Sequence, residues 1–390
     1  MKKTISILGS TGSIGITTLS IIDKKKGEFK VKLLAANKNK DLIYKQIKKY
    51  KPEFFYIKDE NVYKKIKKKI KSNKTKIINN FNSINFKKKI DIAVSAIPGI
   101  VGLNPTIKII KHCKKILIAN KESVICGWRL LKKTSLKHKT TLIPVDSEHY
   151  SISKLIENHS LKEINKVYIT ASGGPFLKFN MEQLKKIKVK DAIRHPKWKM
   201  GKKISIDSAT LMNKILELIE AQKLFNLPDN KLEIIIHPES LVHAIIKFNN
   251  GLTKFIYHET SMVIPLANAI FDGELNIENF YKHKSHNFGV KNLIFKPVNK
   301  DKFPIIKIKK KINEFPSTAI IINASNEVLV DQFIKKKIPF LAINEIILSI
   351  LKNRNYKKYA IKVPNNLTQI YNIDSWARKQ TLKMINYRYE

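Results

Sequence analysis

Three glycines follow the first apolar run of the chain at intervals of three residues. Thr4–Leu8 is a strand candidate, and Gly9, Gly12 and Gly15 separate it from a helix-like segment that is under way by Thr17. Small residues here let the backbone approach a pyrophosphate at the N-terminus of the helix. The order strand, glycine-rich turn, helix predicts the first unit of a Rossmann-like parallel sheet that binds a dinucleotide. An ordinary βα turn is the alternative.

More strand candidates alternate with lysine-rich helical stretches over residues 1–146, which predicts a parallel α/β sheet. The strand candidates are Val31–Ala36, Phe54–Ile57, Ile90–Ser95, Lys115–Ala119 and Thr141–Val145. Residues 64–71 are rich in lysine, but isoleucines recur there at helical spacing, so we expect a solvated amphipathic helix.

The pattern changes after residue 146. We expect a central α+β catalytic domain over 147–272, with a partly antiparallel sheet, then a linker over 273–300 and a small helical C-terminal domain over 301–390. Strand candidates in the central part are Val167–Thr170, Ile234–Ile236, Val242–Phe248 and Leu252–Tyr257, and helix candidates in the last part are Thr318–Lys336, Leu341–Leu351 and Ser375–Tyr387. The fold class is therefore α/β.

The chain has a formal net charge of +44, and five of its 75 basic residues are arginine. A nucleic-acid surface usually combines arginine with aromatic residues, whereas these lysines are spread along the whole chain and accompany many Ile and Asn residues. Adenine- and thymine-rich codons supply all three. We expect no specific nucleic-acid partner, and a basic nucleic-acid-binding protein stays a distant alternative.

The two cysteines, Cys113 and Cys126, do not form a CxxC or Cys/His motif. Disulfide scaffolds and zinc fingers are therefore not expected, and a reducing compartment fits best. No run of about 18 apolar residues occurs, and the start of the chain has no signal-peptide pattern. We expect a soluble, cytoplasmic protein with no membrane partner.

Carboxylates mark a candidate metal site. Asp146-Ser147-Glu148 follows the strand candidate Thr141–Val145, and the carboxyl ends of such strands face the ligand crevice. Glu217 is a third carboxylate in a polar stretch further on. Oxygen ligands of this kind suit Mg²⁺ or Mn²⁺. A surface turn is the alternative interpretation of the first pair.

The stretch from Ser208 to Glu217 holds polar residues between apolar ones. If a helix starts near Ala209, Asn213 and Glu217 share one face, and Lys214 is next to it. Ser208, Asn213 and Lys214 can then hold a phosphate while Glu217 reaches a metal. The alternative is an ordinary amphipathic helix with Ser208 as its N-cap.

Two further segments point to ligand binding. Ser172-Gly173-Gly174-Pro175-Phe176 predicts a turn whose N–H groups and hydroxyl can bind an oxyanion. Residues 194–203 contain His195, Trp198 and Met200 within a segment bounded by proline and glycine, which suits a lid that excludes water. A packed surface loop is the alternative for the second segment.

The end of the second strand candidate bears on the cofactor. NAD enzymes place an acid there for the ribose, but this chain has Asn37, Lys38 and Asn39 after Ala36. A missing acid together with a cation favours a 2′-phosphate, and hence NADP.

Taken together, these motifs resemble the 1-deoxy-D-xylulose 5-phosphate reductoisomerase family, in family order along the whole chain. The matching segments are Gly9–Gly15, Ala119–Ser123, Pro144–His149, Ser172–Phe176, Arg194–Gly201, Ser208–Lys214, Ile236–Ser240 and Asn323–Glu327. The resemblance implies an NADPH- and Mg²⁺- or Mn²⁺-dependent homodimer. It also implies that the enzyme rearranges and reduces 1-deoxy-D-xylulose 5-phosphate to 2-C-methyl-D-erythritol 4-phosphate in isoprenoid precursor synthesis.

The resemblance also implies roles for individual residues. Asp146, Glu148 and Glu217 are the expected metal ligands and, with Lys121 and His195, the expected catalytic residues. The expected cofactor-binding residues are Gly9, Thr11, Gly12, Ser13, Ile14, Gly15, Lys38, Asn39, Asn120, Glu122 and Gly201. The expected substrate-binding residues are Lys121, Ser147, Glu148, Ser172, His195, Trp198, Met200, Ser208, Asn213, Lys214 and Glu217.

The chain departs from the family pattern at Asn37, at Ile215, where a glycine is usual, and over His258–Pro265. We expect activity to survive these departures. Another NADP-dependent oxidoreductase of a phosphorylated sugar or aldehyde is the nearest alternative, but simple hydride transfer does not need the three carboxylates.

Overall fold

The computed structural model describes residues 2–25, 27–70, 74–198, 200–280 and 292–389. Within these ranges, the contacts divide the chain into two compact units. The first contains the described parts of Met1–Ser123, Arg129–Asp146 and Ser261–Asn287, and the second those of Val124–Trp128, Ser147–Thr260 and Phe288–Glu390. Part of the predicted linker, residues 281–291, is outside the described residues.

The first unit is built on a seven-stranded parallel sheet in the order β4-β3-β2-β1-β5-β6-β7. Its elements are β1 (Lys3–Leu8), α1 (Ser13–Lys24), β2 (Phe29–Ala36), α2 (Lys40–Tyr50), β3 (Phe54–Ile57), α3 (Glu60–Lys69), β4 (Lys76–Ile78), β5 (Ile90–Ser95), α4 (Leu103–Ile110), β6 (Cys113–Ile118), β7 (Thr141–Pro144) and α11 (Val263–Phe271). Helix α5 (Lys121–Lys137) begins in this unit, and its segment Val124–Trp128 groups with the second. The predicted Rossmann-like parallel sheet is confirmed.

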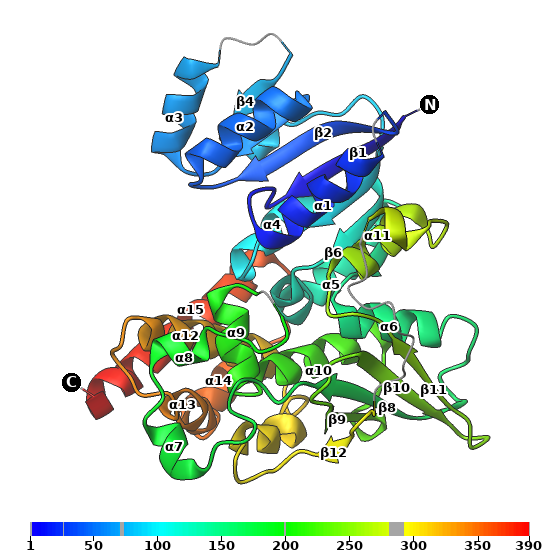
Figure 1. The fold of residues 1–390 in the computed structure, drawn as a ribbon. Coiled ribbons are helices and arrows are strands. Elements are labelled where there is room, and N and C mark those ends of the chain that lie inside the picture. Colours follow the sequence, from blue (N-terminus) through cyan, green and yellow to red (C-terminus); the bar gives the residue numbers. More distant parts are fainter. Residues whose placement is uncertain (1, 26, 71–73, 199, 281–291, 390) are drawn as a thin grey trace. The chain divides into compact units, whose positions relative to one another are not determined.

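The central strands of this sheet are buried on both faces, which is why they read as continuous apolar runs. Ile5, Ile7, Leu33, Leu34 and Val94 are fully buried. Helix α11, far along the sequence, packs beside α1 (Figure 1). In parallel sheets of this kind, which are covered by helices, ligands bind at the edge where the strands end.

The second unit contains a mixed five-stranded sheet in the order β11-β10-β8-β9-β12, with helices against it. Its elements are α6 (Ser147–Leu155), β8 (Ile164–Ala171), α7 (Met181–Lys185), α8 (Val189–Ala192), α9 (Lys202–Ala209), α10 (Met212–Phe225), β9 (Leu232–Ile236), β10 (Val242–Phe248), β11 (Thr253–Tyr257), β12 (Lys296–Pro297), α12 (Thr318–Ile334), α13 (Ala342–Ile350), α14 (Tyr356–Ala360) and α15 (Leu367–Tyr389). Short 3₁₀ turns occupy Phe81–Ser83, Ile100–Gly102, Asp229–Lys231, Ile277–Asn279 and Pro304–Lys311.

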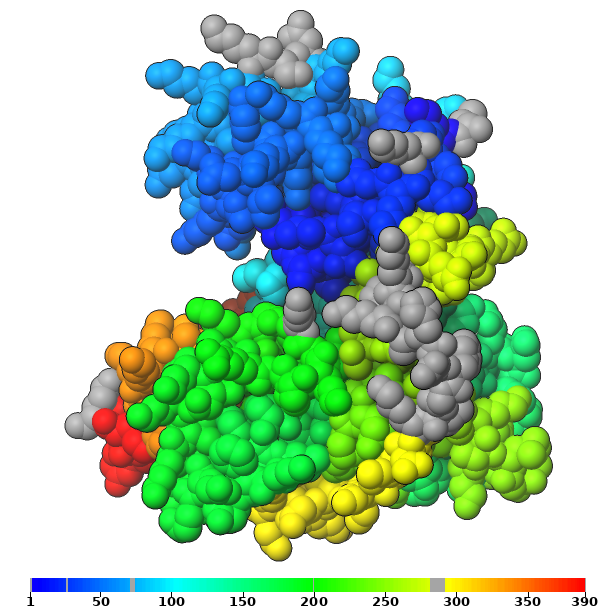
Figure 2. Space-filling model, viewed as in Figure 1, coloured from blue at the N-terminus to red at the C-terminus, as the bar shows by residue number. Residues whose placement is uncertain are grey.

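The C-terminal part of this unit is helical, as predicted, and α12 packs on α9, α13 and α15. The segment that holds α7, α8 and α9 lies on the surface of the unit (Figure 2, green). No helix among the described residues is long and apolar enough to cross a membrane.

The glycine turn after β1 gives a test of the fold. A Cβ on Gly15 would lie 2.3 Å from the Gly9 carbonyl oxygen and 2.6 Å from Ser10 Cα, both backbone atoms that cannot move aside cheaply. We expect Gly15→Ala to lower the free energy of unfolding by about 2 kcal/mol or more, measured by urea denaturation.

Gly12→Ala is the matched control, because its Cβ would meet only the Gly9 oxygen, at 3.4 Å. For Gly12→Ala the loss of unfolding free energy should stay below about 1 kcal/mol, the usual cost of an alanine at an N-cap. Equal losses for the two variants would contradict the close approach at Gly15.

Candidate active site

The glycine turn leaves backbone N–H groups available at the start of α1. Gly9 has a φ of +89°, and a Cβ there would lie 2.5 Å from the Ala96 carbonyl oxygen, so the turn requires glycine. Gly12 is the N-cap of α1 and has no side chain to bond the first turn, where Ser13 and Ile14 follow. An uncapped helix N-terminus of this kind is an anion site. The geometry fits the pyrophosphate of a dinucleotide.

Other predicted cofactor residues lie at the same edge of the parallel sheet. Lys38 and Asn39 follow the end of β2 and are exposed, and Asn120 and Glu122 follow the end of β6 and are buried. Thr11 is half-buried in the glycine turn. Since the strands are parallel, all of these positions are at the ligand-binding edge.

Asn120 and Lys121 are held rigidly at the start of α5. Asn120 caps the helix, because its Oδ1 accepts a hydrogen bond from Ser123 N at 2.6 Å and its Nδ2 donates to Gly99 O at 3.0 Å. The Lys121 ammonium forms an ion pair with Asp146, with 2.8 Å between Nζ and Oδ2. Both side chains of that pair are largely buried, so the ammonium is fixed in place.

In the second unit, the Lys214 ammonium bridges two buried carboxylates. Lys214 Nζ is 2.6 Å from Glu217 Oε2 and also bonds Glu148 Oε1. One oxygen of the Glu148 carboxylate lies within 4.8 Å of one oxygen of the Glu217 carboxylate. Ser147 Oγ donates to Glu148 Oε2 at 2.6 Å. Two buried carboxylates this close need a cation between them, and the lysine supplies it here.

The prediction of a helix from Ala209, with Ser208 as a possible N-cap, is wrong. Ser208 lies in the last turn of α9, and the chain breaks at Leu211, whose φ is +64°, before α10 begins at Met212. The predicted shared face within α10 is confirmed, because Asn213 Nδ2 bonds Glu217 Oε1.

The Ser172 turn packs against the end of α9. Gly173 and Gly174 have φ values of +81° and +69°, and Ser172 Oγ accepts a hydrogen bond from Gly174 N at 3.1 Å. A Cβ on Gly174 would lie 2.8 Å from the Ser208 carbonyl oxygen. The glycine therefore brings the Ser172 and Ser208 regions, both predicted to hold an anion, side by side.

His195 joins the segment 194–203 to the same turn. Its Nδ1 accepts hydrogen bonds from the backbone N–H groups of Lys197 and Trp198, at 3.2 and 3.0 Å, so the proton is on Nε2, which lies 2.9 Å from Ser172 Oγ. Burial and the nearby Lys214 charge lower the pKa of His195 to about 4. The imidazole is therefore neutral at pH 7 and donates to the serine.

The rest of the predicted lid is less closely tied to this cluster. Trp198 packs edge-on against His243, with ring centroids 5.9 Å apart, and Met200 is half-buried. Gly201 is exposed and is the N-cap of α9. Lys199 is outside the described residues. The roles of these residues stay predictions.

Sequence reasoning missed a buried pair behind the carboxylates. His149 Nε2 is 2.8 Å from the Glu217 backbone oxygen, and His149 Nδ1 is 3.4 Å from Glu220 Oε2, with both side chains almost fully buried. The sequence signal that could have found the pair is its spacing from the predicted ligands. His149 comes one residue after Glu148, and Glu220 comes three residues after Glu217. The pair joins α6 to α10 and so fixes the relative positions of the carboxylates.

A second missed contact ties the helical C-terminal part to α9. The Asp207 carboxylate is only 1% exposed; it accepts a hydrogen bond from Asn326 Nδ2 at 2.8 Å and pairs with Lys203 Nζ, also at 2.8 Å. Asn344 Nδ2 donates to Thr210 O at 3.3 Å. Two amides from α12 and α13 therefore hold the segment that presents Ser208.

Three family models match the chain. The model described as 1-deoxy-D-xylulose 5-phosphate reductoisomerase matches residues 5–127, the one described as its C-terminal domain matches 142–225, and the one described as DXP reductoisomerase C-terminal domain matches 259–380.

Whole-length relatives agree. A protein of Pelagibacter ubique named 1-deoxy-D-xylulose 5-phosphate reductoisomerase is 45% identical, over 97% of this chain and 98% of its own length. A crystal structure of DOX-P reductoisomerase in complex with NADPH, fosmidomycin and magnesium has a TM-score of 0.89 at 30% identity, and 98% of each chain is covered. The Zymomonas mobilis enzyme in complex with NADPH has a TM-score of 0.87 at 30% identity, with 99% of each chain covered.

The lowered pKa of His195 predicts a pH dependence. Since the pKa falls from 6.5 to about 4 in the folded protein, the unfolded chain takes up the proton first as the pH drops. Stability from neutral His195 is therefore complete above pH 6.5 and is lost between 6.5 and about 4. Over this window the melting temperature of the wild type should fall more steeply than that of His195→Asn. An imidazole NMR titration with a midpoint near 6.5 would contradict the assignment.

Proposed function

This chain belongs to the 1-deoxy-D-xylulose 5-phosphate reductoisomerase family, and we propose that its reaction takes place on the residues described above. It is an NADPH- and divalent-metal-dependent oxidoreductase that converts 1-deoxy-D-xylulose 5-phosphate into 2-C-methyl-D-erythritol 4-phosphate in isoprenoid precursor biosynthesis. Family membership removes the two alternative functions that the sequence left open, namely another NADP-dependent oxidoreductase and a nucleic-acid-binding protein. The observation that carries the site assignment is the close pair Glu148 and Glu217, bridged by a lysine ammonium.

The metal ligands in this proposal are Asp146, Glu148 and Glu217. Glu148 and Glu217 are buried carboxylates whose oxygens already surround one cation, the Lys214 ammonium, and Asp146 is two residues before Glu148 in the chain. This all-oxygen donor set fits Mg²⁺, and we include Mn²⁺, which prefers the same ligands. A divalent ion bound here supplies Lewis-acid polarisation of the substrate oxygens.

The substrate phosphate is assigned to Ser172, Ser208, Asn213 and Lys214. The Gly174 contact supports this by bringing the first two segments together, and the start of α10 provides an amide and an ammonium. Metal binding by Glu148 and Glu217 would replace their bonds to Lys214, so that its ammonium could turn to the phosphate. Binding of the remote phosphate orients the reacting carbon atoms.

Lys121 and Ser147 are assigned to the reacting oxygen atoms. The Asp146 ion pair holds the Lys121 ammonium in place, where it could donate hydrogen bonds to a substrate hydroxyl or carbonyl. His195, Trp198 and Met200 are assigned to a lid. Neutral His195 holds the Ser172 hydroxyl in position, and the apolar side chains exclude water while hydride is transferred.

The cofactor is assigned to the carboxyl edge of the parallel sheet. The pyrophosphate would lie on the N–H groups of Ser13, Ile14 and Gly15, where no capping side chain competes. Lys38 and Asn39, exposed after β2, would contact the 2′-phosphate that distinguishes NADPH from NADH.

The departures from the family pattern are consistent with activity. Ile215 is fully buried, so its side chain packs into the core, while Lys214 and Glu217 form the polar cluster. Asn37 is exposed. His258 stacks on His243, with ring centroids 3.8 Å apart, and His243 contacts Trp198.

We also infer a homodimer. β11 is the terminal strand of the described sheet, and its surroundings expose Leu252 (58%), Phe255 (47%) and Tyr257 (43%). An apolar strand at a sheet edge readily pairs with another chain, so a second copy is the proposed partner.

For the cellular location we propose the cytoplasm, because Cys113 and Cys126 are buried and not disulfide-bonded.

The activity assay follows NADPH oxidation with 1-deoxy-D-xylulose 5-phosphate and Mg²⁺ or Mn²⁺, with NADH and a chelator as controls. The unmodified chain should oxidise NADPH in this assay. This result also tests whether activity survives with Ile215 in place of the usual glycine. Glu148→Gln and Glu217→Gln should each lower metal-dependent turnover roughly 100-fold or more, because a ligand charge is lost. Glu182→Gln, an exposed carboxylate on α7, is the matched control. Wild-type turnover in both site variants would overturn the metal assignment.

The contact between Asn326 and Asp207 predicts a split in the kinetic constants. Asn326→Leu removes the hydrogen bond that holds the end of α9, so the KM for the sugar phosphate should rise about tenfold and the KM for NADPH should not change. The control is Asn323→Leu in the same helix, since Asn323 bonds Glu327 instead. A parallel rise of both KM values would indicate general misfolding.

The dimer is tested by sedimentation velocity. The wild type should sediment as a dimer at micromolar concentration, and Phe255→Glu should sediment as a monomer, because a charge would be buried at the strand edge. Lys254→Glu, at the neighbouring exposed position whose side chain points to the other face of the sheet, controls for charge alone. A monomeric wild type would exclude the proposal.

A further inference from the structure

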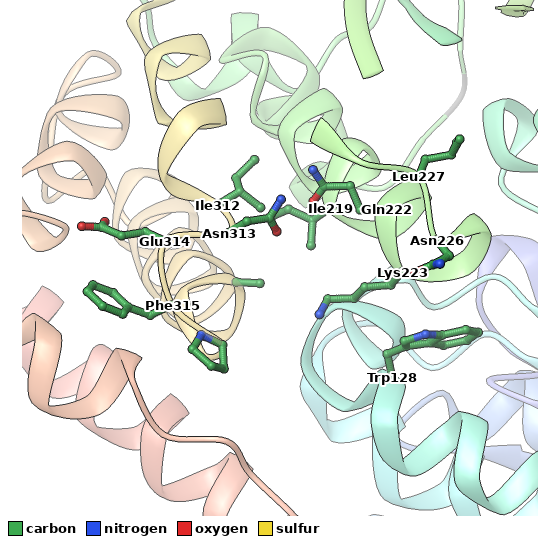
Figure 3. A pocket seen from close by; sticks show the side chains of 12 residues that line it. Trp128, Ile219, Gln222, Lys223, Asn226, Leu227, Ile312, Asn313, Glu314 and Phe315 are labelled. Atoms are coloured by element: carbon green, nitrogen blue, oxygen red, sulfur yellow. The ribbon is translucent and has the colours of Figure 1, made fainter. Parts of the chain in front are cut away.

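A cavity lies beside the C-terminal half of α10, and no residue assigned to the reaction lines it. Its volume is about 470 Å³, within the range of about 300–1,000 Å³ that is usual for small-molecule sites. Trp128 on α5, Lys223 on α10 and Phe315 before α12 contribute side chains to its walls (Figure 3). α10 therefore carries the carboxylate cluster in its first turns and this cavity in its last.

Lys223 is the unusual group in this cavity. It is partly buried, and its ammonium interacts electrostatically with Cys126. Burial lowers its pKa. An ammonium that is partly removed from water is stabilised by an anion beside it.

The other walls suit a flat ring. The Trp128 indole is half-buried beside Lys223 in Figure 3, and Ile219 and Ile312 add apolar surface. Glu314 is the one acidic residue in the lining, and its carboxylate points away from Lys223 (Figure 3). The cavity thus has one cationic side and some aromatic and aliphatic surface, and its remaining walls include the polar side chains of Gln222, Asn226 and Asn313.

We propose that this cavity binds a small organic anion: a planar ring that carries one carboxylate or phosphate group. The ring stacks on the Trp128 indole, the anionic group pairs with Lys223 Nζ, and the two isoleucines pack against the ring edge. Stacking and a charge-assisted hydrogen bond each provide favourable free energy. The proposal does not depend on the assigned reaction, because the two sites share no side chain.

The test uses the full chain saturated with NADPH, Mg²⁺ and fosmidomycin, so that the sites assigned to cofactor and substrate are occupied. Calorimetric titrations use 1-naphthyl phosphate and 1-naphthoate as probes, with uncharged 1-naphthalenemethanol as the control. We expect one site per chain with a Kd below about 1 mM for at least one anion, and at least about tenfold weaker binding of the alcohol. The preferred probe shows whether phosphate or carboxylate is the better group.

Variants then locate the site. Lys223→Met and Trp128→Leu should each weaken binding about tenfold or more, Lys223→Arg should retain it, and the exposed Lys352→Met should not change it. Lys223→Arg keeps the test valid if Lys223→Met does not fold. The proposal is wrong if neither anion binds at about 10 mM, if the alcohol binds equally well, or if a folded Lys223→Met binds like the wild type.

Discussion

The polar cluster at the start of α10 depends on keeping two carboxylates close together in a buried place. Glu148 and Glu217 are 8% and 1% exposed, and two carboxylates this close in a buried place repel each other unless a cation lies between them. The Lys214 ammonium meets this requirement in the structure, and in the proposed site a divalent metal would meet it. The arrangement can exchange one cation for another, because the carboxylates are fixed by other contacts.

Buried polar contacts between elements that are distant in the sequence hold the carboxylates and the segment that presents Ser208. The His149 pair with Glu220 joins α6 to α10, and the Asp207 bond to Asn326 joins α9 to α12. Each is a buried polar contact that is expensive to break by removing one partner. The helical C-terminal part of the chain, which carries none of the assigned ligands, therefore helps to hold the assigned phosphate site.

Local signals explain what the sequence could predict. Strand, glycine turn and helix follow one another directly in residues 3–24, so the parallel sheet and its ligand edge were accessible from spacing alone. The break between α9 and α10 was not, because it places Leu211 in a left-handed conformation that leucine rarely adopts. Short edge strands such as β4 and β12 also lack a signal, since two or three residues show no periodicity.

The composition decides which site residues were easy to recognise. With 75 basic residues against 31 acidic ones, a lysine near a ligand carries little information, whereas an acidic residue among apolar neighbours carries much. Asp146, Glu148 and Glu217 were therefore predicted as a set. The bridging position of Lys214 was not, because it depends on a pair of carboxylates from two helices, and no local pattern reports which of 70 lysines is held between them. Only packing separates the few lysines with buried partners from the many that lie in solvent.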